Sequence, residues 1–258
     1  MNSIYYEEHG EGSVLVFLHG FCETRDIWEN IIAYLSTNFK VITLDLPGFG
    51  KSPLLKSSFT INEVGHTLIE FLEFWGIQKS VIVGHSLGGY VALALAEERP
   101  DMVEGLCLFH STAQADSDQK KLNRNKVMAF VETNGVQPFI ETFVPGLFFQ
   151  KNQEIIDKVY KIASKTSKKT LLAYSRAMRD RPDMTHFLKS FPNRVLFVAG
   201  EQDSIISTVA LQEQSKLTPN GNLIVLQETG HMGMFEDVKG SVKLIKGFAK
   251  SCFRFSDF

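Results

Sequence analysis

The stretch Val81-Ile82-Val83-Gly84-His85-Ser86-Leu87-Gly88-Gly89 decides the fold of this chain. An apolar, β-branched run ends at Gly-x-Ser-x-Gly, and small apolar residues follow at helical spacing from 92 to 96. The pattern predicts a strand, a tight turn and a helix, with Ser86 at the turn. Glycines at 84 and 88 let the strand and the helix approach without a clash of β-carbons. We therefore expect Ser86 at the carboxyl end of a strand, beside a helix N-terminus.

Apolar runs on both sides of this stretch alternate with helical patterns. Runs such as Val14–Leu18 are apolar at every position, which is typical of strands buried on both faces of a parallel sheet. Residues 61–75 show helical spacing. The alternation predicts an α/β fold with a doubly wound, mostly parallel sheet of about seven or eight strands. The expected strands cover residues 4–8, 14–18, 41–44, 81–83, 103–109, 195–199 and 223–226, and a last helix covers 242–248.

The residues from Ser111 to Phe191 interrupt this alternation. Helical patterns cover 126–133, 136–143, 155–164 and 170–178, and no run there is typical of a buried strand. We expect an α/β core formed by residues 1–110 and 192–258, with a helical cap insertion at 111–191 over the strand ends. Insertions at that edge often determine which substrate is bound. The alternative is that these helices merely extend the core.

The insertion is rich in phenylalanine, at Phe130, Phe139, Phe143, Phe148 and Phe149. One interpretation is an apolar pocket suited to short or medium acyl groups. The other is that these rings pack the insertion onto the core. Both remain open from the sequence.

The composition excludes several classes of protein. The 27 Lys and Arg nearly balance the 29 Asp and Glu, and acidic and apolar residues interrupt the basic ones, so we expect no nucleic-acid partner. Three widely separated cysteines argue against a disulfide framework or a zinc site and fit a reducing compartment. No apolar run approaches the ~20 residues of a membrane helix, and residues 1–10 lack a signal-peptide pattern. We expect a cytoplasmic monomer or homodimer that acts on a small molecule.

Ser86 needs a base to become a nucleophile, and the base needs a partner that fixes its tautomer. Asp203 follows the expected strand at 195–199, and His231 follows the one at 223–226. Ligands of open α/β sheets bind at the carboxyl ends of the strands. The order along the chain, nucleophile then acid then base, is the order that accompanies Gly-x-Ser-x-Gly turns. We therefore predict a catalytic triad of Ser86, Asp203 and His231.

Other residues compete for these roles. The alternative acids are Glu201, in the same loop, and the more distant Asp116 and Asp118. His85 adjoins Ser86, but we expect its side chain to point away along the strand. No other histidine follows a strand as favourably as the one at 231.

A serine hydrolase also needs N–H donors for the oxyanion of the tetrahedral intermediate. The Leu87 N–H begins the helix after the turn, and the Phe21 N–H follows the strand at 14–18. Cys22, the next residue, is the alternative donor. It lacks a turn motif and an adjacent base, so we do not expect it to be the nucleophile. The residues expected to contact substrate are Cys22, Phe143, Phe148 and Met232.

Together these motifs resemble the α/β-hydrolase-fold serine hydrolase superfamily, in its esterase-like form with a helical cap. The resemblance rests on His-Gly-Phe at 19–21, Asp-x-Pro-Gly-x-Gly-x-Ser at 45–52, the turn at Ser86, Gly200 with Asp203, and Gly-His at 230–231. It implies that Asp45 belongs to a structural turn. Epoxide hydrolases and haloalkane dehalogenases are similar too, but they carry aspartate where this chain has Ser86.

The resemblance implies hydrolysis of a small carboxylic ester or thioester through an acyl-enzyme on Ser86, with no metal and no organic cofactor. Two alternatives stay open. One is a carbon–carbon bond hydrolase or a menaquinone-pathway-type lyase of the same fold, for which Arg124, Arg176, Arg179 and Arg181 are possible carboxylate contacts. Surface or hinge positions are the favoured interpretation of these arginines, and Arg181 with Pro182 resembles a helix-ending turn. The other is a ligand-binding receptor that retains the triad.

Overall fold

The sheet has seven strands, and the computed structural model describes residues 4–253. The strand order is β1-β3-β2-β4-β5-β6-β7; β1 pairs antiparallel with β3, and every other pair is parallel. The predicted doubly wound, mostly parallel sheet is therefore confirmed. The strands are β1 (Tyr6–His9), β2 (Val14–Leu18), β3 (Lys40–Leu44), β4 (Ser80–His85), β5 (Val103–Phe109), β6 (Arg194–Gly200) and β7 (Gly221–Leu226).

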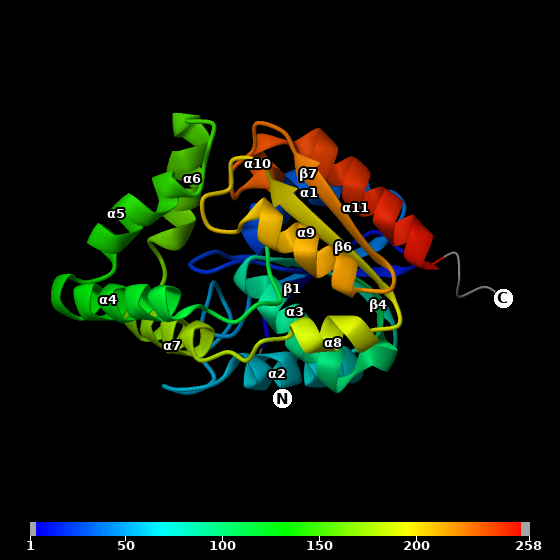
Figure 1. Cartoon of the computed structure of the whole chain (residues 1–258), viewed down its shortest axis with the longest axis horizontal. Coiled ribbons are helices and arrows are strands. Elements are labelled where there is room, and N and C mark those ends of the chain that lie inside the picture. The colour runs from blue at the N-terminus through cyan, green and yellow to red at the C-terminus, as the bar shows by residue number, and fades with distance from the viewer. Residues whose placement is uncertain (1–3, 254–258) are drawn as a thin grey trace.

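Helices cover both faces of the sheet (Figure 1). On one face α1 packs against α11, and on the other α2 packs against α3, while α9 packs along β6 and β7. The capping box of Thr60 and Glu63 fixes the start of α2. These helices are α1 (Glu29–Leu35), α2 (Ile61–Phe74), α3 (Leu87–Glu98), α9 (Thr208–Leu217), α10 (Gly233–Glu236) and α11 (Val238–Phe253).

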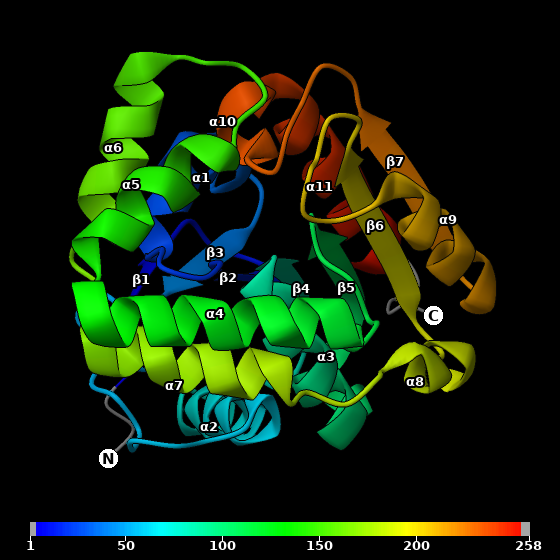
Figure 2. The ribbon, with the colours of Figure 1, turned by 60° about the vertical axis from the view of Figure 1, so that its left-hand side comes forward.

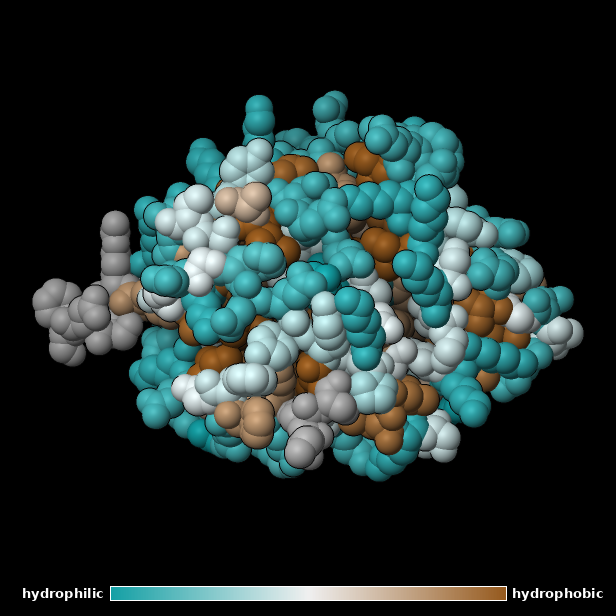
Figure 3. Space-filling view, turned by 180° about the vertical axis from the view of Figure 1, so that it is seen from behind, coloured by the Kyte–Doolittle hydropathy of each residue, from teal (hydrophilic) through white to brown (hydrophobic). Residues whose placement is uncertain are grey.

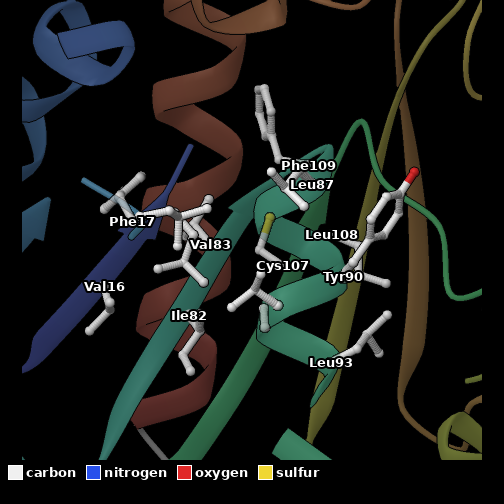
Figure 4. Packing of buried hydrophobic residues seen from close by; sticks show 14 of the residues in the cluster. Val16, Phe17, Ile82, Val83, Leu87, Tyr90, Leu93, Cys107, Leu108 and Phe109 are labelled. Carbon is white, nitrogen blue, oxygen red and sulfur yellow. The ribbon is translucent and has the colours of Figure 1, made fainter. Parts of the chain in front are cut away.

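β4 lies near the middle of the sheet, between β2 and β5, and leads into α3. Every residue of α3 from Leu87 to Ala96 is buried, so this helix belongs to the core on all sides. Figure 4 shows Val83 of β4, Cys107 of β5 and Leu87 of α3 among these packed side chains. The segment that ends in Ser86 is therefore held between buried elements of the core.

None of the described residues from 111 to 191 lies in a strand. Five helices occupy this segment, and α4 packs against α7 and α5, while α5 packs against α6. In Figure 2 α4 to α7 lie in front of the sheet, whereas α8 packs against α9 beside it. The division into core and cap stays a prediction. The helices are α4 (Asp118–Asn134), α5 (Gln137–Gly146), α6 (Gln153–Ala163), α7 (Lys168–Arg179) and α8 (Thr185–Ser190).

The surface in Figure 3 is mainly hydrophilic, with apolar residues in small separate groups. Across residues 4–253, no helix combines the length and the apolar character that crossing a membrane requires.

Candidate active site

Ser86 occupies a sharp turn between β4 and α3. Its φ of 48° and ψ of −112° are strained for a residue with a β-carbon. Neighbouring segments hold the turn, because Ser86 N–H donates to Phe109 O at 3.0 Å and Ser111 Oγ–H donates to Ser86 O at 2.7 Å. A β-carbon on Gly84 would lie 2.5 Å from the carbonyl carbon of Gly88. The predicted strand, turn and helix are confirmed, and the two glycines make the turn possible.

Asp203 follows β6, and His231 follows β7, so both reach the same edge of the sheet as Ser86. His231 Nδ1–H donates to Asp203 Oδ2 at 2.8 Å. The other carboxylate oxygen accepts the backbone N–H groups of Ile205 and Ile206 at 2.8 and 3.1 Å. These bonds fix the carboxylate and select the imidazole tautomer whose Nε2 is free to accept a proton.

Burial and charge act in opposite directions on the pKa values of this pair. Burial raises the pKa of the Asp203 carboxyl, but the positive charge and N–H of His231 and the N–H of His110 outweigh it and hold this pKa well below its usual range. Burial lowers the pKa of His231, but the nearby carboxylates, Asp203 above all, outweigh it and raise this pKa. His231 is therefore a stronger base than a free imidazole.

The loop after β2 carries the N–H of Phe21, one predicted oxyanion donor. This loop lies against the start of α3, because a β-carbon on Gly88 would be 2.5 Å from Leu18 O and 2.8 Å from His19 O. The other predicted donor is the N–H of Leu87, the first residue of α3. The fold thus brings the two donor segments together at the carboxyl ends of β2 and β4.

His19 and Asp45 hold these loops in place. His19 Nδ1–H donates to Gly20 O at 2.8 Å, and its Nε2 accepts the Leu46 N–H at 2.9 Å. Asp45 Oδ2 accepts the Lys51 N–H at 2.9 Å. Both side chains are buried and occupied by backbone contacts, which agrees with the structural role expected for Asp45.

His85 links the turn at Ser86 to the loop of His231. The sequence predicts that its side chain points away, but it is fully buried and its Nε2–H donates to His231 O at 3.0 Å. The two imidazole rings lie 4.9 Å apart between centroids. Within residues 4–253 no hydrogen bond joins Ser86 Oγ to His231, and such bonds often tighten only when substrate is present.

A sequence model of the alpha/beta hydrolase fold matches residues 13–238. The chain belongs to the α/β-hydrolase family. This hydrolase is 27% identical over 253 residues to a pimeloyl-[acyl-carrier protein] methyl ester esterase of Legionella pneumophila, a match that covers 96% of this chain and 100% of that protein. An esterase from Thermogutta terrifontis, solved with malate bound, has a TM-score of 0.91 and 27% identity, over 96% of this chain and 93% of that one.

A longer relative is also similar to the hydrolase. It is a dihydrolipoyllysine-residue acetyltransferase component of the acetoin cleaving system from Pseudomonas putida, 29% identical over 240 residues. The match covers 90% of this chain but only 62% of that protein.

His110 is a polar neighbour of Asp203 that the sequence motifs do not mark. It follows β5, has a φ of 48°, and its Nδ1–H donates to Asp203 Oδ2 at 3.3 Å. Burial lowers the pKa of His110 to about 4, so it stays neutral and donates rather than competing for the proton. His110 follows β5, which lies between the strands that lead to Ser86 and Asp203. This position is the sequence signal that could have placed His110 in the site.

His110, Asp203 and His231 are also close enough to hold a metal ion, since one ligand atom of each lies within 4.8 Å of the others. In the hydrolase, however, both Nδ1 atoms carry the hydrogen that they donate to Asp203. A metal would have to displace both hydrogens. The donor set fits hydrogen bonding better, and the absence of a metal stays a prediction.

Glu236 of α10 ties the loop of His231 to the segment after α5. Its Oε2 accepts the Gly230 N–H at 2.9 Å, and its Oε1 accepts the N–H groups of Phe149 and Gln150 at 2.7 and 2.8 Å. His231 N–H donates to Leu147 O at 2.8 Å. One carboxylate thus joins two segments that are far apart in the sequence.

A pocket of about 280 Å³ lies between the helices α4, α5 and α7 on one side and the loops that follow β2 and β6 on the other. Phe21 forms part of its wall together with Phe143, and the two rings are 6.0 Å apart between centroids. Ser204 and Ile205, which follow Asp203, line it as well. We call the loop after β2 that carries Phe21 the oxyanion loop, and the loop after β6 that carries Asp203 the acid loop. The pocket adjoins both of them.

Of the predicted substrate contacts, Phe143 lines this pocket. Cys22, Phe148 and Met232 are buried and do not line it. A larger hollow of about 750 Å³ lies between α2 and the end of α7, and the triad residues do not line it. Cys22, Phe148 and Met232 stay predictions as substrate contacts.

Proposed function

We propose that this hydrolase cleaves a small carboxylic ester or thioester through an acyl-enzyme on Ser86, with His231 as the base and Asp203 as its orienting partner. The observation that carries the proposal is the 2.8 Å bond from His231 Nδ1 to Asp203 at the edge where Ser86 ends β4. The names of the relatives from Legionella pneumophila and Thermogutta terrifontis, both esterases, support the reaction class.

In the first half-reaction His231 Nε2 takes the proton of Ser86 Oγ while the oxygen attacks the carbonyl carbon of the substrate. The N–H groups of Phe21 and Leu87 hold the resulting oxyanion, and each such donor contributes roughly 3 kcal/mol in the transition state. His231 then returns the proton to the leaving alcohol or thiol. The Asp203 carboxylate stabilises the imidazolium while it exists.

In the second half-reaction water replaces the alcohol. His231 removes a proton from the water, which attacks the acyl-enzyme carbonyl, and the same two N–H groups hold the second oxyanion. Protonation of Ser86 Oγ by His231 releases the carboxylic acid. We place this chemistry in the cytoplasm, in a monomer or homodimer.

We expect kcat/KM to depend on acyl chain length. Burial of one methylene contributes ~0.8 kcal/mol, so each added carbon that enters an apolar pocket raises kcat/KM up to about fourfold. p-Nitrophenyl esters from acetate to octanoate measure this, and we expect a maximum between butyrate and hexanoate, set by the pocket of about 280 Å³. Equal kcat/KM across the series would contradict an apolar acyl site.

A fluorophosphonate probe separates the open alternatives. A hydrolase of esters labels at Ser86 and turns the esters over. A carbon–carbon bond hydrolase or a lyase with the same nucleophile labels without efficient ester turnover. A receptor with a very slow triad labels slowly and releases product once rather than repeatedly. Failure both to label and to turn over any ester in the series would refute the proposed function.

A further inference from the structure

The pocket beside the active site has one apolar wall and one cationic wall. Phenylalanines of α5 and the oxyanion loop form the apolar wall. The opposite wall is α4, which contributes Lys120, Asn123 and Arg124. Lys120 reaches across from α4 to the acid loop, where its Nζ donates to Ile205 O at 3.4 Å. The cations thus lie at the end of the pocket that approaches Asp203.

The carboxylate that lines this pocket does not balance the positive charge of the cationic wall. Asp116 is the carboxylate of the pocket, and its Oδ1 accepts from Arg181 Nη1 at 2.8 Å, while Oδ2 accepts from Arg124 Nε. Arg181 is buried, also donates to Met178 O at 2.6 Å, and lies 3.9 Å over the Tyr90 ring. Two arginines thus share the single carboxylate of the pocket, and together with Lys120 the positive charges outnumber it.

Arg124 and Lys120 still have donors to offer. Arg124 uses Nε on Asp116, and among the described residues its two Nη atoms meet no acceptor. Within residues 4–253, the hydrogen bonds of Lys120 Nζ are limited to the long contact with Ile205 O. Burial is the main cause that lowers the pKa of Lys120, and Arg181 and Arg124 lower it further, while Asp116 and Asp203 raise it. An anion placed here would relieve the excess of positive charge.

We propose that Lys120 and Arg124 bind a carboxylate at the far end of the substrate, so that the natural substrate is an ester or thioester whose apolar chain ends in an anionic group. This inference rests on the proposed function and names its substrate class. The apolar wall takes the chain and the cations take the carboxylate. A guanidinium and an ammonium together suit the two oxygens of a carboxylate.

Two matched esters test this proposal: mono-p-nitrophenyl glutarate, which is an anion, and its methyl ester, which is neutral and only slightly longer. We expect kcat/KM to be at least tenfold higher for the anion. In Lys120→Ala and Arg124→Gln this ratio should fall about tenfold each, the size expected for one charged hydrogen bond. Lys126→Ala, an exposed lysine on the same helix that does not line the pocket, is the control and should keep the ratio.

The outcomes separate this inference from the proposed function. Hydrolysis of both esters at equal rates, or equal effects of the variants on both, overturns the carboxylate site and leaves the esterase standing. No hydrolysis of either ester overturns the proposed function. A readout without turnover is the binding of glutarate to the Ser86→Ala protein, measured by the shift in Tm. We expect the shift to be lost in Ser86→Ala with Lys120→Ala, and a retained shift overturns the site.

A second inference rests on a different observation, a buried carboxylate and imidazole pair beneath the active site. Glu23 and His85 are 3% and 0% exposed in their side chains, and Glu23 Oε2 accepts from His85 Nδ1 at 2.9 Å. The same oxygen accepts the Gly20 N–H at 2.6 Å. Both ring nitrogens of His85 face oxygen atoms, one of the Glu23 carboxylate and the other His231 O. The pair thereby connects the oxyanion loop, the turn at Ser86 and the His231 loop.

We infer that Glu23 is a positioning residue for the reaction, acting through Gly20 and His85 on the oxyanion donor and on the base. It does not touch the reacting atoms. Its carboxylate is also one of the charges that raise the pKa of His231. The role therefore has a geometric part and an electrostatic part, and the two can be measured separately.

Glu23→Gln keeps the shape of the side chain and removes its charge. We expect kcat to fall at least tenfold with KM within about threefold, and the acid limb of the pH profile to move to lower pH. If this variant does not fold, the double variant Glu23→Gln with His85→Gln replaces the carboxylate and the imidazole by two neutral amides. Unchanged kcat and an unmoved acid limb in a folded variant, or a loss that only follows the unfolded fraction, overturn the inference.

Discussion

Ser86→Ala is expected to lower kcat for p-nitrophenyl butyrate by about a million-fold and to abolish fluorophosphonate labelling. Without Oγ no acyl-enzyme forms, and Asp203 and His231 have no nucleophile to activate. The Tm should change little, because alanine has the same β-carbon as serine at a φ of 48° and the backbone bonds of the turn do not involve Oγ. Labelling read by intact-protein mass and Tm by calorimetry measure the two effects.

The matched control is Ser190→Ala, whose exposed side chain lies at the end of α8. It should label and turn over ester like the unmodified enzyme. Retained labelling in Ser86→Ala would show that another residue is the nucleophile. Cys22 is a poor substitute, because burial raises the pKa of its thiol and leaves almost no thiolate at neutral pH.

Asp203→Asn is expected to lower kcat about 10,000-fold. The amide can present its NH₂ to His231 Nδ1, which selects the wrong tautomer and places hydrogen on the Nε2 that must accept the serine proton. KM should change much less, because Asp203 does not line the pocket. Steady-state kinetics with p-nitrophenyl butyrate measure the split.

The same variant should shift the pH profile in a defined direction. His231 acts as a base only when neutral, so kcat/KM falls as the pH drops through its pKa. The Asp203 carboxylate raises that pKa, and its loss lowers it, so the acid limb of the residual activity should move to lower pH. Glu201→Gln is the control, because Glu201 is exposed and was the competing acid. A larger loss in Glu201→Gln than in Asp203→Asn would reassign the acid.

Much of this architecture follows from local patterns in the sequence. The strand at 81–83, the glycines beside Ser86 and the order of the later strands predict the sheet and place Ser86, Asp203 and His231 at one edge. A parallel sheet gathers its carboxyl ends regardless of the details of packing, so positions after strands suffice. Asp203 and His231 are joined by a hydrogen bond, and the catalytic roles of the three residues stay a prediction.

Contacts between distant segments were not predictable in the same way. His85 meets Glu23 across 62 positions and His231 across 146, and no local pattern encodes such partners. Arg181 resembled a helix-ending residue, yet it is buried against Asp116. Polar groups of this kind are placed by the tertiary structure, which decides which buried donor finds which acceptor.

The carboxylate of Glu236 has a consequence for exchanging caps between hydrolases. It accepts backbone N–H groups on both sides of a boundary that a protein engineer would cut, at Phe149 and Gln150 on one side and at Gly230 on the other. A graft that replaces Leu147 would also have to restore the position of the backbone carbonyl that accepts from His231 N–H. Residues 147–150 should therefore travel with the catalytic framework, and a transplanted specificity module should end at α5 and resume after them.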